Sequence, residues 1–487
     1  MKYKYLLEDI SVFLKKSTTA KSGIWYLVSD FLLKGMAFIT VPIFTRLLSV
    51  EEYGIVSVYT SFVAVMAIVS GLDLNAGLGR ATIDFKEEYP KYLSSVLSLS
   101  VAFFLGGFLV ILVFSSTISG WVGLPSDLIA IASIVGYGSF VFKFYNSHLL
   151  FQQKYKQKSL LHVVKAVSEV VLAIILILAI SKAKYYGKVY SSLIMALAFM
   201  VICFIIIFRK SKKVFFPKAW WYAIKIGIPL VPHSLSGIML AQFDRMAIQA
   251  LVGATETGLY SFAYNIGMIP LVIQGAIVST WSPWLYKNLN QNKRDRIREA
   301  SLILTQLFLV VVAFVVMIGP ELAVFLAPNV YSASISMISV VSLGYFFQFM
   351  YMIYVGFAMY HKKTFLVSLG TLLAGGINVV LNLWLIPIYG YEIAAWTTVF
   401  SFIALFLFHW INTRFVIREN VVPINRMLLM GGLCTGLVTT IYLVQKSFMP
   451  RSSIEAIIRY SLSIIVVLPA AFYSFKQVKK MSLVRKN

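Results

Sequence analysis

Long apolar stretches joined by short polar loops restrict this chain to one class of fold. A membrane-spanning helix needs about 20 apolar residues, and 14 stretches reach that length, the last being the weakest because Glu455 and Arg459 lie at its start. Only 13% of the 487 residues are charged, against about 25% in soluble domains. We therefore expect an all-α integral membrane protein and exclude an ordinary soluble enzyme. The stretches lie at about 22–45, 55–79, 93–116, 126–149, 160–181, 189–208, 222–250, 258–284, 301–319, 335–360, 365–387, 392–413, 427–445 and 457–475.

Lysine and arginine are distributed unevenly among the predicted loops. With the N-terminus placed in the cytoplasm, 31 of the 43 Lys and Arg residues fall in inner loops or at the termini, and 6 fall in outer loops. Cytoplasmic loops of membrane proteins collect these residues. The distribution predicts that both termini are cytoplasmic. It also explains the net charge of +24, so we expect no nucleic acid among the partners.

The first 21 residues contain five lysines but no apolar core that leads to a small-residue cleavage site. We therefore expect no cleavable signal peptide. Apolar residues recur here at spacings of three and four, which predicts a short helix lying on the cytoplasmic leaflet. A frayed tail is the alternative. These apolar residues are Tyr3, Leu6, Leu7, Ile10, Phe13 and Leu14.

Residue types that bind metals or form disulfides are sparse. The 2 cysteines, Cys203 and Cys434, lie inside apolar stretches, and the 5 histidines show no metal-ligand spacing. Disulfide frameworks and zinc sites both require recognisable spacings. We expect no disulfide, no metal site and no resident cofactor, with H+ or Na+ as candidate coupling ions for transport.

A short sequence repeat relates the two halves of the chain. Residues 52–57 (EYGIVS) recur as residues 256–261 (ETGLYS), 204 positions later. Each copy follows the first stretch of a six-stretch block. Because six is even, both blocks enter the membrane in the same direction, as in parallel-repeat transporters. The expected domains are an N-terminal segment (1–21), two six-helix lobes (22–214 and 215–415), and an extra helix pair with a basic tail (416–487).

Several charged residues fall inside the apolar stretches. A charge at the bilayer centre costs about 2.5–3.5 kcal/mol even on the mildest scale, so it needs a partner, a wet cavity or a function. In the fifth stretch, Lys158, His162, Lys165 and Glu169 follow helical spacing and form one stripe that rises from the cytoplasmic end. The candidate substrate-binding cations are Lys34, Lys143, Lys165, Arg80 and Arg245, and the candidate ion-coupling acids are Asp30, Asp73, Glu169 and Asp244.

We interpret these charges as the lining of a cavity that opens first to the cytoplasm and holds an anionic group, since lysine is a good point-charge ligand for phosphate. Structural explanations compete with this one. Lys143 and Lys165 could extend to the cytoplasmic interface. Asp30 and Lys34, one helical turn apart, could neutralise each other, and Asp244 and Arg245 could form a structural pair.

Three segments contain short motifs in a characteristic order. The first contains TRLLSVEEYG at 45–54 and GLDLNAGLGRA at 71–81. The second contains the Asp244-Arg245 pair before GLYSFA at 258–263, and the third reads LNLWLIPIYGYEIAAW at 381–396. Together these segments resemble the polysaccharide flippases, the O-antigen and capsule (Wzx-type) transporters of the multidrug/oligosaccharidyl-lipid/polysaccharide (MOP) superfamily. In the third segment, Glu392 or Ile393 replaces a glycine of the family pattern.

The resemblance implies two six-helix bundles that flip an undecaprenyl-pyrophosphate-linked oligosaccharide from the cytoplasmic to the outer leaflet by alternating access. It also implies residence in the inner (cytoplasmic) membrane of a bacterium. The implied partners are the lipid-linked oligosaccharide and membrane lipids, with polysaccharide polymerase and chain-length machinery as candidates. In related 14-span lipid II flippases, cavity cations hold the pyrophosphate and the extra helix pair forms a groove for the lipid tail.

Two other functions compete with a flippase. An ion-driven multidrug exporter of the same superfamily would favour buried carboxylates over buried lysines, which the lysine-rich first half argues against. A membrane glycosyltransferase or polymerase would need catalytic groups in sizeable outer loops, and the predicted outer loops are short. We therefore do not expect an enzyme.

Overall fold

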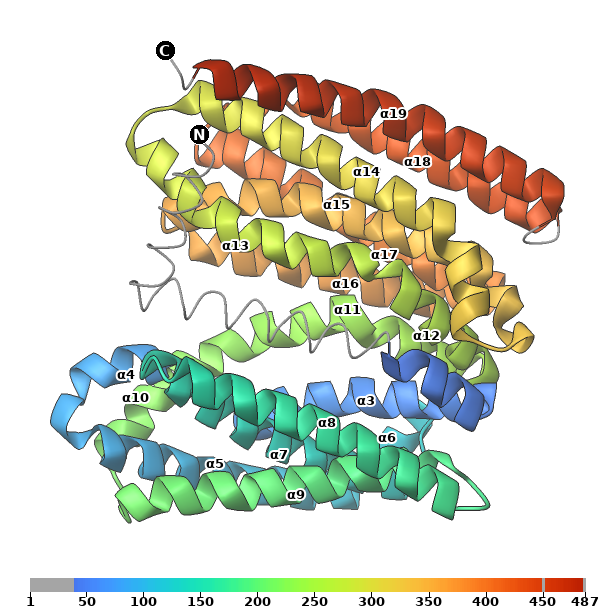
Figure 1. Cartoon of the computed structure of the whole chain (residues 1–487). Helices are drawn as coiled ribbons and strands as arrows, with labels where there is room; N and C mark the ends of the chain where they lie inside the picture. The colour runs from blue at the N-terminus through green and yellow to red at the C-terminus, as the bar shows by residue number, and fades with distance from the viewer. Residues whose placement is uncertain (1–38, 449–451, 485–487) are drawn as a thin grey trace, which may run out of the picture. The chain divides into compact units, whose positions relative to one another are not determined.

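The computed structural model describes residues 39–448 and 452–484, with side chains to residue 472, and all regular structure in these ranges is helical. Within them, 13 helices are long and apolar enough to cross a membrane (Figure 1). The all-α membrane fold is thereby confirmed. Most of the apolar stretch 22–45, the interfacial helix expected in 1–21, and both Asp30 and Lys34 lie outside the described residues.

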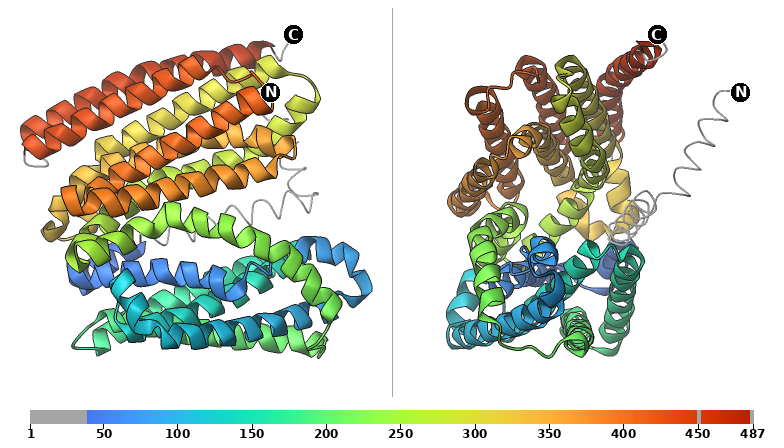
Figure 2. Two further views of the ribbon diagram at one scale, coloured as in Figure 1. Left: turned by 180° about the vertical axis from the view of Figure 1, so that it is seen from behind. Right: turned by 90° about the vertical axis from the view of Figure 1, so that its left-hand side faces the viewer.

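The chain divides into two compact units, the first containing Tyr59–Ser234 and the second containing Val41–Val58 and the chain from Leu235 onward. Helix α3 (Val50–Gly71) therefore contributes to both units. In the first unit, α8 packs against α9, and α7 packs against both (Figures 1 and 2). The other helices of this unit are α4 (Leu78–Asp84), η1 (Lys86–Glu88), α5 (Tyr89–Val113), α6 (Ser115–Val122), α7 (Ser126–Phe151), α8 (Tyr155–Ala179), α9 (Tyr185–Lys210) and α10 (Pro217–Gly227).

In the second unit, α15 is buried along most of its length and packs against α12, α14, α17 and α18. Helix α19 packs along α14 and α18 (Figure 2). The helices of this unit, the first of which begins in the preceding unit, are α11 (Val231–Leu251), α12 (Ala254–Gly267), α13 (Ile269–Asn290), α14 (Arg294–Leu326), η3 (Asn329–Ser334), α15 (Ile335–Tyr360), α16 (Thr364–Tyr389), α17 (Ile393–Ile411), η4 (Asn412–Val416), α18 (Ile424–Ser447) and α19 (Ser453–Val484).

Proline interrupts two of the predicted apolar stretches. The stretch at 222–250 consists of α10 and α11, separated by the 3-10 turn η2 (Ile228–Leu230), which contains Pro229. The stretch at 258–284 breaks at Met268, and Pro270 lies in the first turn of α13. Proline lacks the N–H that an unbroken helix would use at these positions, so it starts a new helix readily and interrupts an existing one.

The TRLL motif has a structural role within the second unit. Arg46 donates from Nη1 to the Leu326 carbonyl at 2.9 Å and from Nη2 to the Phe325 carbonyl at 3.0 Å. The Thr45 hydroxyl also donates to the Leu326 carbonyl, at 3.0 Å. The last carbonyls of a helix have no partner within the helix. Arg46 and Thr45 supply partners to the end of α14, which ties the chain before α3 to the second unit.

Candidate functional site

The first unit contains a cluster of two lysines and one glutamate on adjacent helices, which we call the two-lysine cluster. Lys165 and Glu169 lie one turn apart on α8, and the Lys165 ammonium donates to Glu169 Oε2 at 3.1 Å. Lys188 of α9 donates to Glu169 Oε1 at 2.7 Å. About a fifth of each side chain is exposed, at 21%, 20% and 18% for Lys165, Glu169 and Lys188. Two ammonium groups, one from each helix, therefore share the carboxylate of Glu169.

The helical hairpin explains how Lys188 reaches Glu169. Glu169 lies ten residues before the end of α8, whereas Lys188 lies in the first turn of α9. At 1.5 Å of rise per residue, their backbones differ in depth by roughly 10 Å. Two extended side chains bridge that distance only if Lys188 points along the helix toward Glu169. The predicted stretches 160–181 and 189–208 left Lys188 in the outer loop between them, and this was wrong because helix α9 already begins at Tyr185.

Aromatic and hydroxyl groups surround the two-lysine cluster. The Lys165 ammonium lies 5.5 Å from the ring centroid of Phe142 on α7, within the range of a cation–π contact. The Tyr59 hydroxyl of α3 lies 2.8 Å from the Ser192 hydroxyl, one helical turn after Lys188 on α9. Four helices of one unit thus contribute to this polar region. The stripe predicted for the fifth stretch does lie on one helix, α8.

Lys143 pairs with Asp73, separately from the two-lysine cluster. Its ammonium donates to Asp73 Oδ1 at 3.1 Å, and the Lys143 side chain is 53% exposed whereas that of Asp73 is 6% exposed. Asp73 follows the end of α3 in the left-handed region, with φ of 47°. Its other carboxylate oxygen, Oδ2, is buried and has no hydrogen-bond partner within the described part of the chain. Two predicted site residues from different groups therefore form one ion pair.

Arg80 lies at the surface of the first unit. It forms an ion pair with Asp84 one turn along α4, at 3.0 Å, with 70% of the Arg80 side chain exposed. The Tyr222 hydroxyl donates to the same carboxylate at 2.7 Å. The hydrogen bonds from Tyr222 and Arg80 lower the pKa of Asp84 below its ordinary value. An exposed pair of this kind contributes little to stability.

Asp244 and Arg245 lie in the second unit and are both buried. Asp244 accepts a hydrogen bond from the Tyr260 hydroxyl. The guanidinium of Arg245 lies 4.2 Å from the ring centroid of Tyr264 and donates to the Ala241 carbonyl at 3.1 Å. These contacts match the structural-pair explanation.

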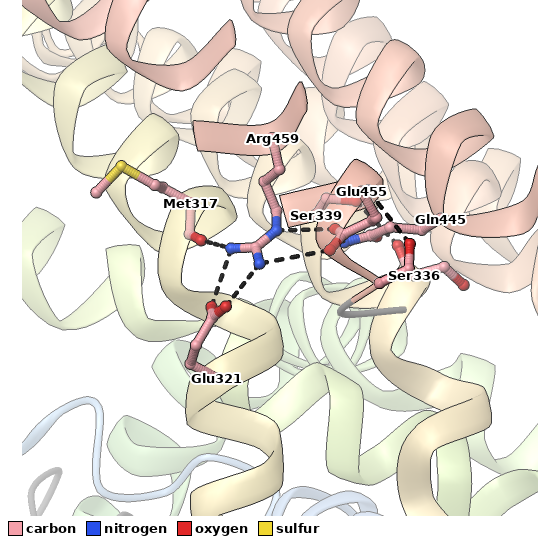
Figure 3. Close-up of polar contacts among 8 residues, drawn as sticks. Met317, Glu321, Ser336, Ser339, Gln445, Glu455 and Arg459 are labelled. Atoms are coloured by element: carbon pink, nitrogen blue, oxygen red, sulfur yellow. Dashed lines mark hydrogen bonds and ion pairs between the residues drawn. The ribbon is translucent and has the colours of Figure 1, made fainter. Parts of the chain in front are cut away.

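The sequence analysis missed a buried ion network at Arg459, which Figure 3 shows between α14 and α19. The fully buried Arg459 side chain donates to Glu455 at 2.8 Å and to both oxygens of Glu321, at 2.9 and 2.6 Å. It also donates to the Met317 carbonyl, and Gln445 of α18 donates to Glu455 at 3.0 Å. The four-residue spacing of Glu455 and Arg459 was the available signal.

No group of three or more His, Cys, Asp or Glu side chains is arranged to hold a metal ion in the described ranges. Cys203 and Cys434 are both buried free thiols.

Solved transporter structures share this fold. A structure titled lipid II flippase MurJ, inward closed conformation, has a TM-score of 0.62 and 16% identity, over 92% of this chain and 99% of that chain. An inward-facing multidrug resistance MATE family transporter of the MOP superfamily has a TM-score of 0.61 and 13% identity, over 79% and 99%. The chain is a multi-pass membrane protein with the fold of the MOP superfamily.

The family model described as Polysaccharide biosynthesis protein matches residues 19–289, more than half of the chain. The chain belongs to this family, whose fold is that of transporters and flippases. Lsg locus putative protein 1 of Haemophilus influenzae is 25% identical over 56% of this chain and 67% of its own length. Succinoglycan biosynthesis transport protein ExoT of Rhizobium meliloti is 23% identical over 61% of this chain and 59% of its own.

Proposed function

We propose that this protein flips a polyprenyl-pyrophosphate-linked oligosaccharide, a repeat unit of O-antigen, capsule or a related surface polysaccharide, from the cytoplasmic to the outer leaflet. It resides in the bacterial inner membrane with both termini in the cytoplasm. Membership of the polysaccharide biosynthesis family supports a surface-glycan precursor as substrate. The transporter relatives and the MurJ-like fold support movement of such a precursor across the bilayer.

The two-lysine cluster is the observation that carries the proposal. Lys165, Glu169 and Lys188 place two ammonium groups and one carboxylate inside two helices long and apolar enough to span a membrane. Burying charge in lipid is expensive, and such residues commonly mark substrate pathways. Lysine ammonium groups bind phosphate as point charges. In this mechanism the pyrophosphate takes hydrogen bonds from Lys165 and Lys188, while Glu169 holds the two lysines in position between substrates.

A multidrug exporter is the competing function because the MATE fold is also similar. Exporters of cationic drugs need a carboxylate that is available to the cargo. Glu169 is already bound by two lysines in the first unit, at 3.1 and 2.7 Å. This arrangement favours an anionic substrate over a cationic one.

Reconstitution in liposomes tests the proposal directly. The purified protein is incorporated with a fluorescent polyprenyl-pyrophosphate oligosaccharide, and the fraction of glycan that a membrane-impermeant reagent reaches is followed over time. We expect flipping by the native chain and loss of flipping in a Lys165→Met/Lys188→Met double variant. The control variant is Lys182→Met, which changes an exposed lysine in the loop between α8 and α9. Equal flipping rates for the double variant and the control would contradict the proposal that the two-lysine cluster binds the headgroup.

The same liposome assay can identify the coupling ion. We propose H+ or Na+ as the coupling ion, with Asp73, Glu169 and Asp244 as the acids to substitute, and Asp30 and Lys34 as further positions for variants. Imposing a pH gradient or a sodium gradient separately identifies the ion.

Polysaccharide polymerase and chain-length proteins are proposed partners, to be tested by co-purification from the native membrane.

A further inference from the structure

Helices α15, α16 and α17 of the second unit pack against one another (Figure 1). None of the three contains Asp, Glu, Lys or Arg. His409, near the end of α17, is the residue in these helices whose side chain can gain a proton near neutral pH. The His409 side chain is fully buried. A charge on this imidazole would therefore have no counter-ion within the three helices.

The polar atoms of His409 are unusual because they are buried and unpaired. A neutral imidazole carries one N–H donor and one acceptor nitrogen, and neither ring nitrogen has a hydrogen-bond partner within residues 39–448 and 452–472. The amide of Asn412, one turn farther along, is also buried, and neither its oxygen nor its nitrogen is bonded there. Native proteins leave few buried polar atoms unpaired, and each case requires an explanation.

The other buried polar side chains of α16 and α17 are all hydrogen-bonded. Asn382 donates to Asn378 Oδ1 at 3.1 Å, and Thr397 donates to Asn382 Oδ1 at 2.6 Å. Paired polar side chains of this kind hold helices together in a membrane. His409 and Asn412 depart from that pattern, so helix association does not explain them. The paired side chains are Thr371, Asn378, Asn382, Thr397, Thr398 and Ser401.

Three helices enclose the imidazole of His409. A Cβ on Gly370 of α16 would lie 2.8 Å from His409 Nε2, so glycine makes room for the ring on that side. On α15, the Tyr351 ring centroid lies 5.0 Å from that of His409. The Tyr354 hydroxyl, three residues farther along α15, is buried and unpaired in the described part of the chain. The π-helical turn η4 begins at Asn412, and such turns frequently occur at functional sites.

Protonation would change the bonding needs of this site. A proton converts the acceptor nitrogen of His409 into a second donor. The side-chain oxygen of Asn412 is an unpaired acceptor one turn away, and the face of the Tyr351 ring suits a cation. A charge in lipid needs a partner or water. Since α15, α16 and α17 contain no carboxylate, protonation favours conformations that admit water at this end of α17.

Charged groups follow directly after the ends of these helices. The Glu419 N–H donates to the Thr413 carbonyl at 3.0 Å, and the Glu419 carboxylate accepts from Arg294 at 3.0 and 3.1 Å. His361, which follows α15, lies 3.5 Å from Glu419 Oε1. A test of proton binding must therefore separate His361 from His409. Exposed cations in the same loops are Lys362, Lys363, Arg414 and Arg418.

We propose that His409 is a proton-binding site of the second unit, at the end of α17 that the proposed orientation places in the cytoplasm. The ring nitrogen without hydrogen forms an N–H bond with a proton from hydronium, which leaves a water molecule, and the reverse step releases the proton. The bound proton loosens the packing of α17 against α15 and α16 at this end.

This inference deepens the proposed function, since it names H+ as the coupling ion, and it rests on that function for the transport step alone. The three acids proposed above for substitution each accept a hydrogen bond from a lysine or a tyrosine. The His409 ring has no such partner in the described ranges that a proton would have to displace.

The first test measures how fast a membrane-impermeant thiol reagent modifies Thr413→Cys between about pH 8 and pH 5. Thr413 is buried one turn after His409. Phe415→Cys, at an exposed position, corrects for ionisation of the thiol. Both variants are made in a Cys203→Ala/Cys434→Ala background. We expect the ratio of the Thr413→Cys rate to the Phe415→Cys rate to rise severalfold as the pH falls, and to stay constant once His409→Gln is added.

His361→Gln is the matched control because it removes a histidine at the same end of the unit but outside the helices. We expect the pH response of the ratio to persist in this control. A response that His361→Gln abolishes and His409→Gln retains would overturn the assignment to His409. A ratio that does not change with pH while both histidines are present would overturn the proton-linked loosening.

The second test observes the proton by NMR in the otherwise native protein in nanodiscs, with isotope-labelled histidine. The ring nitrogens distinguish neutral from charged imidazole, and the spectrum of His409→Gln identifies the His409 signals. His409→Asn repeats the assignment with a second side chain that does not titrate. We expect His409 to change from neutral to charged over the pH range in which Thr413→Cys becomes reactive. Signals that stay neutral over that range would overturn the proton site.

Transport separates this inference from the proposed function. In liposomes, a pH gradient should speed flipping by the native chain and leave the rate of His409→Gln unchanged. If the native chain flips the glycolipid and the gradient changes neither rate, H+ coupling at His409 is overturned. If the native chain flips no glycolipid, the proposed function fails instead. The accessibility and NMR tests then still decide whether His409 binds a proton.

Discussion

Glu169 of α8 accepts a hydrogen bond from Lys188 of α9 at 2.7 Å, although Glu169 lies ten residues from the end of its helix and Lys188 lies in the first turn of its own. Lys165 completes the carboxylate's partners from one turn away, at 3.1 Å. Because every charge in the cluster lies within a helix that spans the membrane, changing one charge exposes the others to an uncompensated low-dielectric environment.

Neutralising Glu169 tests what holds the lysines. In Glu169→Gln the two ammonium groups lose their shared counter-ion and repel each other, so we expect lower thermal stability without substrate. A pyrophosphate-containing lipid should then stabilise the variant more than it stabilises the native chain. Thermal unfolding with and without that lipid measures both effects. Equal ligand-induced shifts in the two proteins would contradict the account of the cluster.

Each lysine of the cluster should contribute separately to headgroup binding. A hydrogen bond to a charged group is worth about 1.5–3 kcal/mol, so Lys165→Met or Lys188→Met should weaken binding of a short-chain polyprenyl pyrophosphate by about tenfold or more. Fluorescence titration gives the affinities. The matching polyprenyl monophosphate is the comparison ligand. If Lys182→Met weakened binding and neither cluster variant did, the headgroup would bind outside the two-lysine cluster.

The Arg459 network should hold the extra helix pair to α14. Arg459→Met leaves Glu455 buried without its main partner, and breaking a buried ion pair on one side costs about 3–5 kcal/mol. We expect a marked loss of thermal stability. Adding Glu455→Gln should restore part of that stability because the buried carboxylate that lost the guanidinium is then neutral. No loss from Arg459→Met, or no recovery in the double variant, would show that the network is not structurally important.

The cap formed by Arg46 predicts a stability effect at a family motif. Arg46→Ala leaves the carbonyls of Phe325 and Leu326 without the guanidinium, and the loss should be about 1–3 kcal/mol, as for charge-assisted hydrogen bonds. In Arg46→Lys a single ammonium group replaces the two donor nitrogens of the guanidinium, so we expect the variant to retain part of the thermal stability. Thermal unfolding orders the three proteins, and an unchanged Arg46→Ala would contradict the capping role.

Asp84 gives a pH-dependent prediction outside the membrane spans. The hydrogen bonds from Tyr222 and Arg80 lower its pKa in the folded state. Its contribution to stability is therefore present above the unfolded pKa and is lost as the pH falls through the lower folded value. Tyr222→Phe removes the larger cause, so the titration midpoint of Asp84, followed by carboxyl NMR of labelled protein, should move up toward the ordinary value. An unmoved midpoint would contradict this assignment.

Apolar length and periodicity predicted the membrane fold well because each spanning helix must satisfy its own backbone in lipid. Thirteen of the expected stretches are helices long enough to cross. Side-chain partners between helices were harder to predict. The Lys165 and Glu169 pair follows from four-residue spacing, but Lys188 joins it only because the hairpin between α8 and α9 is tight, which composition does not reveal.

Ion pairs that link distant segments had no sequence signal of their own. Asp73 and Lys143 are 70 residues apart and meet where two left-handed residues, Leu72 and Asp73, follow the end of α3. Glu321 and Arg459 are 138 residues apart. Such pairs depend on the packing of whole helices, so charge counts identified the residues concerned but did not pair them. The repeat, by contrast, was found from sequence, and the structure supplied the physical reason for its glycine.

The glycines of the repeat serve backbone packing, since a Cβ on Gly54 would lie 2.0 Å from the Ala254 carbonyl oxygen and a Cβ on Gly258 would lie 2.0 Å from the Val50 carbonyl oxygen. Any other residue at either position would push the two backbones apart, so packing alone restricts both positions to glycine. A sequence profile built on these two glycines will therefore detect proteins that share the fold. Substrate preference has to be inferred from other positions.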